Sequence, residues 1–337
     1  MRNPIYVLPS ASEKLDASME PVLLIDKNDA ITSIGPGVYL TGQLTQISSR
    51  LLTAKRPVLN GIKLFPISTE VVQGAQRFTR IMVEHLGHAA MIADYSDDLP
   101  AAELAVSQDT VDLKDLGSSY NYSLKDLEAG RAAAQIRRGP GIDLPMHKAF
   151  AARAANETLV NDIVWDGLPE ANLYGVFTMP TVPRYAIGLD SSTAAIDTLV
   201  EGICAFFNSV QDDTNNAEAA KRLLMASRLR NRLATRFRTN TDSSILDMVV
   251  KGCEGLGSTS DIIGVHELNG KGDAGGDALI ADSRDETIMG IVLPKPLDQR
   301  PAQERNLAWI VNVVTGIGGM MSNFPHGLRI GEMTNAL

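Results

Sequence analysis

Apolar residues between positions 144 and 166 recur at helical spacing, and this segment predicts the longest helix of the chain. The apolar stripe comprises Ala149, Ala152, Leu159 and Ile163. Asp143 can cap the helix, Pro145 suits its first turn and Gly167 ends it. At 1.5 Å per residue the helix would span roughly 30 Å, and its alanines would let neighbouring backbone pack closely.

Apolar and polar residues alternate from Gln76 to Tyr95, which is typical of a strand. A polar tip follows at residues 95–100, and a second strand region runs from Ala105 to Leu116, so we predict a long β-hairpin. A two-stranded ribbon with polar residues on both faces has little stability of its own. We therefore expect the hairpin to rest on another surface, such as a neighbouring copy of the chain.

The first 50 residues are polar and rich in proline, serine, threonine and glycine, with short apolar runs such as Val22 to Ile25. Such a segment cannot bury itself, so we expect an extended arm that is disordered alone or ordered on another surface. A shorter helix is predicted to begin at Ser123, where Asp126 completes a pair like a capping box. It should end before the glycine–proline break at 139–141.

After residue 190, helices and strands alternate, which is typical of a compact α/β region. The predicted helices run from Ile196 to Val210, from Ser227, and from Thr241 or Asp242. The predicted strands span Arg222 to Ala226, Ile262 to Leu268, Ala278 to Asp282 and Thr287 to Leu293. Residues 303–330 predict two or three further long strands, which should return to pack on the central helix.

The composition is that of a globular protein with a real core, since 44% of the 337 residues are hydrophobic and 21% are charged. No apolar run approaches the roughly 18 residues of a membrane span, and the first residues lack the pattern of a signal peptide. Cys204 and Cys253 lie among apolar residues in predicted helices, which indicates buried thiols and a reducing compartment. The net charge of −9 argues against a surface devoted to nucleic acid but allows a local basic face.

The sequence contains no phosphate-binding G-x-x-x-x-G-K-[ST] loop, no G-x-S-x-G elbow and no H-E-x-x-H pair. The glycine-rich segment Gly270–Asp277 is interpreted as a flexible loop. His85 and His88 would point to opposite faces of a strand, which argues against a metal site. His266 and Glu267 would likewise point apart and form no dyad. We therefore predict no enzymatic activity, no cofactor and no bound metal.

Four segments carry a family resemblance. They are YNYSLKDLEAG from Tyr120, KAFAARAANETLVNDIVWDG from Lys148, NLYGVFTMPTVP from Asn172 and GIGGMMSNFPHGLRI from Gly316. Together with the arm, the hairpin and the α/β region, they resemble the major capsid proteins of tailed bacteriophages. Those proteins have the Hong Kong 97-type fold and are related to encapsulating shell proteins. The turn at 176–178 reads Val-Phe-Thr, where the family often has Leu-Leu-Asn.

The resemblance implies an α+β fold of four parts. These are an N-terminal arm (1–55), an extended β-hairpin loop (77–123), a peripheral domain (56–76, 124–185 and 300–337) whose spine helix is about 144–166, and an α/β axial domain (186–299). It implies a structural protein that assembles from hexamers and pentamers into an icosahedral shell around double-stranded DNA, in a virion made in the host cytoplasm. The implied partners are other copies, non-specifically held DNA, a separate scaffolding protein, a portal and a decoration protein, with no membrane.

Charged residues of the hairpin are candidate contacts between subunits. They are Arg77, Arg80, Glu84, Asp94, Asp97 and Asp98. Exposed ion pairs contribute about 0–1 kcal/mol each, so their repetition over many copies would matter. The alternative for any one of them is a solvated charged face.

A basic run is the second candidate surface. It comprises Arg222, Arg228, Arg230, Arg232, Arg236 and Arg238, of which Arg228, Arg230, Arg232 and Arg236 are candidates for facing packaged DNA. We favour the alternative that the run is a solvated helix face or pairs with Asp212, Asp213 and Glu218.

Two other classes of protein compete with a viral capsid. A nanocompartment shell of the same fold would hold enzyme cargo, but such shells usually replace the extended arm with a cargo-binding helix. The polar, proline-interrupted first 50 residues therefore favour the viral class. They are also too short for a large internal scaffolding domain, which is why we expect a separate scaffolding protein. An α/β enzyme of unknown class is the remoter alternative.

Overall fold

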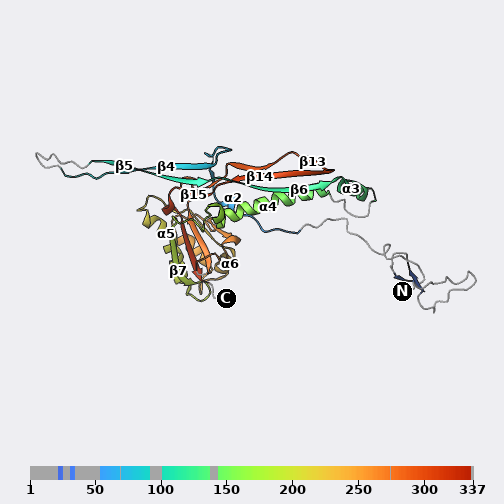
Figure 1. Cartoon of the computed structure of the whole chain (residues 1–337). Helices are drawn as coiled ribbons and strands as arrows, with labels where there is room; N and C mark the ends of the chain where they lie inside the picture. Colours follow the sequence, from blue (N-terminus) through green and yellow to red (C-terminus); the bar gives the residue numbers. More distant parts are fainter. Residues whose placement is uncertain are drawn as a thin grey trace, which may run out of the picture. The chain divides into compact units, whose positions relative to one another are not determined.

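The computed structural model describes residues 22–25, 31–34, 54–68, 70–91, 101–136, 143–273 and 275–334. The chain divides into two compact units, one of Met1–Lys55 with Leu124–Leu144 and the other of Arg56–Ser123 with Pro145–Leu337. In the first unit, β1 (Val22–Ile25) pairs with β2 (Ile31–Ile34), and α3 (Leu124–Ile136) follows the predicted start near Ser123 (Figure 1). The rest of the predicted arm lies outside the described residues, apart from its last two positions.

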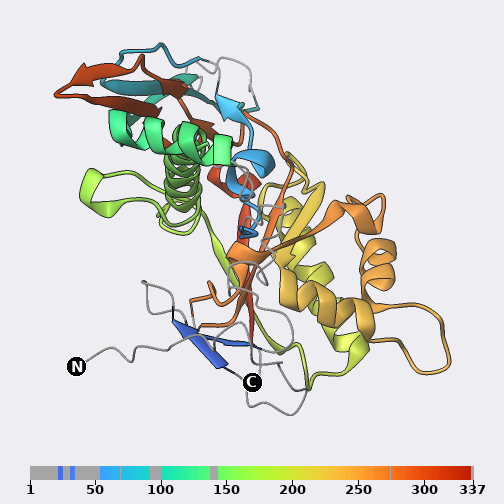
Figure 2. The ribbon, with the colours of Figure 1, turned by 90° about the vertical axis from the view of Figure 1, so that its right-hand side faces the viewer.

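The longest helix, α4 (Leu144–Asp166), has the predicted bounds and lies against an antiparallel sheet (Figure 2). At the centre of that sheet is β14 (Ala308–Ile317), which pairs over its whole length with β6 (Lys114–Ser123). Its other edge is shared by β12 (Lys295–Gln299) and β13 (Gln303–Arg305). The late strands therefore do return to pack on the central helix, as the sequence predicts.

The contact between α4 and its sheet combines two hydrogen bonds with an apolar cluster. Ser118 Oγ of β6 donates to the Ala152 carbonyl at 3.2 Å and accepts from Asn156 Nδ2 at 3.0 Å. Further along the helix, a buried cluster joins α4 to β14; its members are Val160, Ile163, Leu173 and Ile317. Because a buried amide needs partners, the Asn156 bond allows a polar residue in this interface.

The predicted apolar stripe of α4 is partly wrong. Ala152 and Ile163 are buried, but Leu159 is 41% exposed. Val160 and Asn156 are buried in its place, four residues apart and on the face that meets the sheet. Because the polar Asn156 lies on the buried face, apolar residues alone do not mark that face, and their periodicity predicted Leu159 to be buried in place of Val160.

The C-terminus of α4 is closed by the segment that follows it. Gly167 has a φ of +73°, a left-handed conformation that favours glycine at a helix end. The chain then turns back, so that the N–H of Val176 donates to the Val164 carbonyl at 2.9 Å and that of Phe177 donates to the Trp165 carbonyl at 3.0 Å. These bonds satisfy carbonyl groups that a helix end would otherwise leave unpaired.

A five-stranded mixed sheet forms the α/β region. Its order is β7 (Arg184–Asp190), β16 (Arg329–Thr334), β10 (Asp277–Asp282), β8 (Arg222–Ala226) and β9 (Ile262–Val265). Its helices are α5 (Ile196–Asp213), α6 (Ser227–Thr235) and α7 (Ile245–Gly252). Every residue of β8 and β10 is buried, which is typical of strands covered on both faces.

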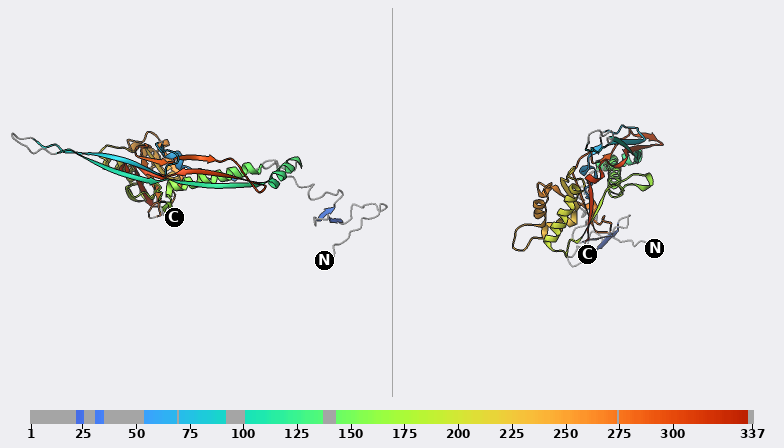
Figure 3. Two further views of the ribbon diagram at one scale, coloured as in Figure 1. Left: turned by 45° about the horizontal axis from the view of Figure 1, so that its top comes forward. Right: turned by 90° about the vertical axis from the view of Figure 1, so that its left-hand side faces the viewer.

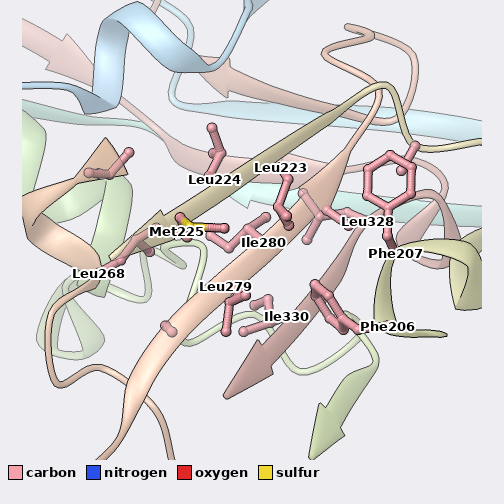
Figure 4. Close-up of a cluster of buried hydrophobic side chains, with 14 of the residues drawn as sticks. Phe206, Phe207, Leu223, Leu224, Met225, Leu268, Leu279, Ile280, Leu328 and Ile330 are labelled. Atoms are coloured by element: carbon pink, nitrogen blue, oxygen red, sulfur yellow. The ribbon is translucent and has the colours of Figure 1, made fainter. Parts of the chain in front are cut away.

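The core of this region includes side chains of α5, α6 and α7 as well as of the sheet. Figure 4 shows Phe206 of α5 beside Leu279 and Ile330 of the sheet, and Phe207 near Leu328, the residue before β16. A Cβ atom at Gly331 would lie 2.6 Å from the Phe206 ring, so glycine is what lets that ring pack directly on β16.

Three details of the α/β region differ from the sequence prediction. α7 begins at Ile245 rather than near Thr241, because Ser244 and Asp247 complete a capping box there. The predicted strand Ile262–Leu268 ends at Val265, and His266–Leu268 form a 3-10 turn. Residues 329–334 form β16, which pairs with β10 and β7, whereas the last predicted strand ends at residue 330 and was expected to pack on the central helix.

The remaining elements are a small sheet and a long hairpin. The small sheet has the order β15 (Gly319–Ser322), β11 (Met289–Val292) and β3 (Ile67–Ser68), the last following the short helix α2 (Gly61–Leu64). The hairpin pairs β4 (Arg77–Leu86) with β5 (Glu103–Asp112). The predicted return strand from Ala105 to Leu116 is therefore two strands, β5 and β6, divided at Leu113. Further 3-10 turns lie at Pro169–Ala171, Thr259–Asp261 and Pro325–Gly327.

Candidate assembly surfaces

The β4–β5 hairpin projects from the rest of its unit as a two-stranded ribbon (Figure 3). Its register runs from the pair Arg77–Asp112 at the root to Leu86–Glu103 toward the tip. Directly paired residues of antiparallel strands lie on the same face, and successive pairs alternate between faces. The register therefore divides the ribbon into two chemically different faces.

At the root, one face of the ribbon is anchored. Phe78 lies opposite Val111, and both pack into an apolar cluster with Val292 of β11 and Met321 of β15. The root is therefore held by the small sheet, which gives the rest of the ribbon a fixed direction.

The other face becomes apolar and exposed toward the tip. Val83 lies opposite Val106, flanked by Ile81 and by Leu104. The exposed fractions are 63% for Ile81, 51% for Val83, 57% for Leu104 and 57% for Val106. We call these four residues the ribbon patch. Contiguous exposed aliphatic side chains of this kind mark surfaces that bind a partner.

The predicted contact residues of the hairpin have different surroundings. Arg77 pairs with Asp112 at 3.0 Å on the exposed root. Arg80, whose side chain is 13% exposed, donates to Asn323 Oδ1 at 2.5 Å and to Ser68 Oγ at 2.9 Å, so it ties the ribbon to the small sheet. Glu84 is exposed and makes no hydrogen bond or ion pair within the described part of the chain. Asp94, Asp97 and Asp98 lie outside the described residues.

A groove of about 780 Å³ runs along the root of the ribbon. Its lining includes Phe78, Ile81 and Val83 from β4 and the exposed Phe324 from the loop after β15. The groove therefore shares Ile81 and Val83 with the ribbon patch, and its walls also carry charged side chains such as Glu70 and Glu286. The sequence prediction included neither the ribbon patch nor the groove. It named only charged residues of the hairpin as contacts, although the alternation of apolar residues such as Ile81 and Val83 is present in the sequence.

The predicted basic residues around α6 are engaged with their own fold. Arg228 Nε donates to Asp277 Oδ1 at 2.5 Å, and Arg230 Nε donates to the Ile262 carbonyl at 2.9 Å. Arg232 Nη1 donates to Ser191 Oγ at 2.5 Å. Arg236 donates to the carbonyls of Ser191 and Ala194 at 2.7 and 2.9 Å. Arg228 is exposed and the other three are half-buried, so these arginines connect α6 to neighbouring loops and strands.

The predicted pairing of the basic run with nearby acids is wrong for Arg222 and Asp213. Arg222 forms a buried two-pronged pair with Asp282 of β10, and Asp213 pairs with Arg329 of β16. Both partners are distant in sequence and become neighbours only through the sheet.

His266 and Glu267 are in contact, contrary to the prediction, because they lie on a 3-10 turn rather than a strand. His266 Nδ1 is 2.9 Å from Glu267 Oε2, and the Glu267 carboxylate also accepts from the N–H and side-chain amide of Asn60. Nearby on α4, partial burial and the neighbouring Asp166 carboxylate raise the pKa of Asp162. Within the described residues, no group of three or more His, Cys, Asp or Glu side chains is placed to hold a metal ion. The contacts among Asn60, His266 and Glu267 therefore connect the start of α2 to the 3-10 turn after β9.

The projecting ribbon, the long helix packed on a sheet and the α/β region are together typical of a structural subunit that assembles into a shell. The family model for the major capsid protein matches residues 87–331, and the chain belongs to this family. It is a structural capsid protein, and membership of the family places it in the virion. No curated protein sequence matches the chain.

Solved structures show the same fold. The capsid of Myoviridae phage XM1 has a TM-score of 0.74 at 16% identity, over 88% of this chain and 99% of that one. The capsid of an empty GTA particle has a TM-score of 0.60 at 10% identity, over 86% and 95%. A structure from Mycobacterium phage Adephagia has a TM-score of 0.58 at 11% identity, over 87% of this chain and 95% of that one. The predicted α+β Hong Kong 97-type capsid fold is therefore confirmed, whereas the predicted domain boundaries stay a prediction.

Proposed function

We propose that the chain forms the icosahedral head of a tailed bacteriophage, and that copies assemble through the β4–β5 ribbon. The observation that supports this most directly is the ribbon patch, which no described part of the chain covers. Full burial of an aliphatic side chain contributes roughly 1.5–3 kcal/mol, so covering four half-exposed ones would contribute roughly 1 kcal/mol each. Repeated around a closed shell, this is a substantial driving force for assembly.

The charged hairpin residues take secondary roles in this proposal. Arg77, Glu84, Asp94, Asp97 and Asp98 would form exposed ion pairs with a neighbouring copy and select its orientation rather than supply most of the affinity. Arg80 would act indirectly, since its bonds to Ser68 and Asn323 hold the ribbon at its root.

The finer identity of the particle is also proposed. We infer that hexamers and pentamers enclose double-stranded DNA without sequence-specific contacts, Arg228 being the most exposed of the four arginines proposed to face it. A separate scaffolding protein, a portal and a decoration protein are the proposed partners, and subunits are made in the host cytoplasm before they enter the virion. The subunit has a structural and not an enzymatic role, and no helix among the described residues is long and apolar enough to cross a membrane.

Electron microscopy with light scattering tests the proposal. We expect the wild-type chain, expressed with the other head proteins, to give rings or hollow shells that contain DNA. Val83→Asp with Val106→Asp should reduce assembly at least tenfold, because two charges would have to be buried in the contact. Leu307→Asp, at an exposed residue in the turn between β13 and β14, is the matched control.

Three results would overturn parts of the proposal. A wild-type chain that stays monomeric at high concentration with the other head proteins would refute the shell function. Normal assembly of the double variant would refute the role of the ribbon patch. Shells that hold enzyme cargo in place of DNA would show a nanocompartment.

A further inference from the structure

The two cysteines of the chain lie side by side, although 48 residues separate them in sequence. Cys204 is on α5, and Cys253 is the C-cap residue directly after α7. Both thiols are free, and their sulfur atoms are 3.1 Å apart. A disulfide bond is about 2.05 Å long, so a small rotation of the two side chains would bring the sulfurs to bonding distance.

The packing around the pair leaves room for this bond. A Cβ atom at Gly252 would lie 2.8 Å from Cys204 Sγ, so the glycine provides the space that the sulfur occupies. The N–H of Cys253 donates to the Val249 carbonyl at 3.0 Å, which fixes its backbone at the end of α7. The two helices thus already hold the two thiols side by side.

The two thiols differ in exposure and acidity. Cys253 is 1% exposed, whereas Cys204 is half-buried. A hydrogen bond from the Cys253 thiol lowers the pKa of Cys204, while that bond and burial raise the pKa of Cys253. A thiolate and not a thiol attacks a disulfide, so Cys204 is the residue suited to react first.

We propose that Cys204 and Cys253 form an intrachain disulfide when the protein meets a low-molecular-weight disulfide. The Cys204 thiolate attacks one sulfur of that reagent, forms a mixed disulfide and releases one thiolate. Cys253 then loses its proton and attacks Cys204 Sγ, which forms the Cys204–Cys253 bond and releases the second thiol. Two protein thiols are oxidised, and one small disulfide is reduced to two thiols.

The bond would tie α7 to α5, the helix whose phenylalanines pack on the five-stranded sheet. A crosslink that closes a loop of this length stabilises a fold by restricting the unfolded chain. Its timing rests on the proposed function, because a head assembled in a reducing cytoplasm meets oxidising conditions on release. The subunit would then fold and assemble with free thiols and gain the crosslink afterwards.

Oxidised glutathione added to the purified, unassembled chain tests the bond itself. We expect a mass lower by about 2 Da, a peptide that links the segments of Cys204 and Cys253, and an apparent Tm raised by several degrees. Dithiothreitol should reverse all three, and Cys204→Ser should show none of them. Glutathione retained on Cys204, crosslinks between chains, or unchanged free thiols would each overturn the proposal.

The timing needs a separate measurement on assembled particles. Particles isolated from cells in the presence of a thiol-blocking reagent should carry two blocked thiols per chain, whereas released particles should carry the disulfide. A Cys204–Cys253 disulfide already present in particles from cells would overturn the proposed timing but not the proposed bond. Because the first experiment needs no assembly, its result does not depend on whether the chain forms a shell.

Discussion

Replacing Arg222 with leucine should destabilise the folded subunit strongly. Its guanidinium donates from Nε and Nη2 to the two carboxylate oxygens of Asp282, each at 2.5 Å, and the side chains are 7% and 5% exposed. Removing one partner of a buried ion pair leaves an uncompensated charge and costs about 3–5 kcal/mol. The Arg222 guanidinium also lies 5.8 Å from the centre of the Phe65 ring, a contact that the variant loses. Since a domain is stable by only about 5–15 kcal/mol, this loss is a large fraction.

Urea unfolding of unassembled subunits, followed by circular dichroism, measures this loss. Arg153→Ala is a matched control, because that arginine pairs with Glu157 on the exposed side of α4 and should change the free energy of unfolding by about 0.5 kcal/mol or less. Arg222→Met with Asp282→Leu should recover most of the stability, since replacing both charges by apolar groups is often neutral. A loss below about 1 kcal/mol in Arg222→Leu would refute the reasoning.

The pH dependence of that variant gives an independent check. Burial raises the pKa of Asp282, and Arg222 opposes the rise, so the variant should have a still higher pKa. A carboxyl group with a raised folded-state pKa binds protons more tightly when folded, and it therefore adds stability as the pH falls through that pKa. The deficit of Arg222→Leu relative to wild type should consequently shrink between pH 7.5 and pH 5. An equal deficit at both pH values would show that charge burial is not its cause.

Two further predictions concern helix ends. Gly175→Ala should lower the free energy of unfolding by at least about 2 kcal/mol, because its Cβ would lie 2.3 Å from the Gly167 nitrogen and 2.6 Å from the Trp165 carbonyl oxygen. An unchanged urea midpoint would contradict this close approach. Ser244→Ala should lower the free energy of unfolding by about 1 kcal/mol, because Ser244 Oγ accepts the Asp247 N–H at the start of α7. Ser244→Asp should restore most of that stability, and equal stability of the alanine and aspartate variants would exclude a capping role.

The hydrogen bonds at the start of α7 also predict a pH effect. The bonds from Ser244 lower the pKa of Asp247, so this carboxylate stabilises the fold above its unfolded-state pKa, and that contribution is lost as the pH falls through the folded-state value. Ser244→Ala lacks the hydrogen bond from the Ser244 hydroxyl to the Asp247 carboxylate. The stability that this variant loses as the pH falls should therefore be smaller than the stability that the wild type loses.

Local sequence patterns were sufficient for the elements that depend on local chemistry. The bounds of α4 followed from its capping and stop residues, and β8 followed from an uninterrupted apolar run with a helix start after it. The order of helices and strands, with four short segments, was specific enough to identify the capsid fold. Helix propensity, capping and strand alternation act over a few residues, which is why they can be read without a structure.

Contacts between distant segments could not be read in this way. The buried partners of Arg222 and Asp213, the entry of residues 329–334 into the five-stranded sheet, and the meeting of Cys204 with Cys253 all depend on which strands and helices become neighbours. The same holds for Arg80, whose side chain looked free in the sequence and is held by the small sheet.

The sequence by itself determined most elements and their order, because local backbone preferences and apolar periodicity encode these, and the resemblance of four segments to capsid proteins supplied the fold class. Only the tertiary structure decided which hairpin face is anchored and which presents the ribbon patch, because that choice depends on the register of β4 with β5 and on what packs at its root. A shift of one residue in that register would bring the other face of β5 beside Ile81 and Val83.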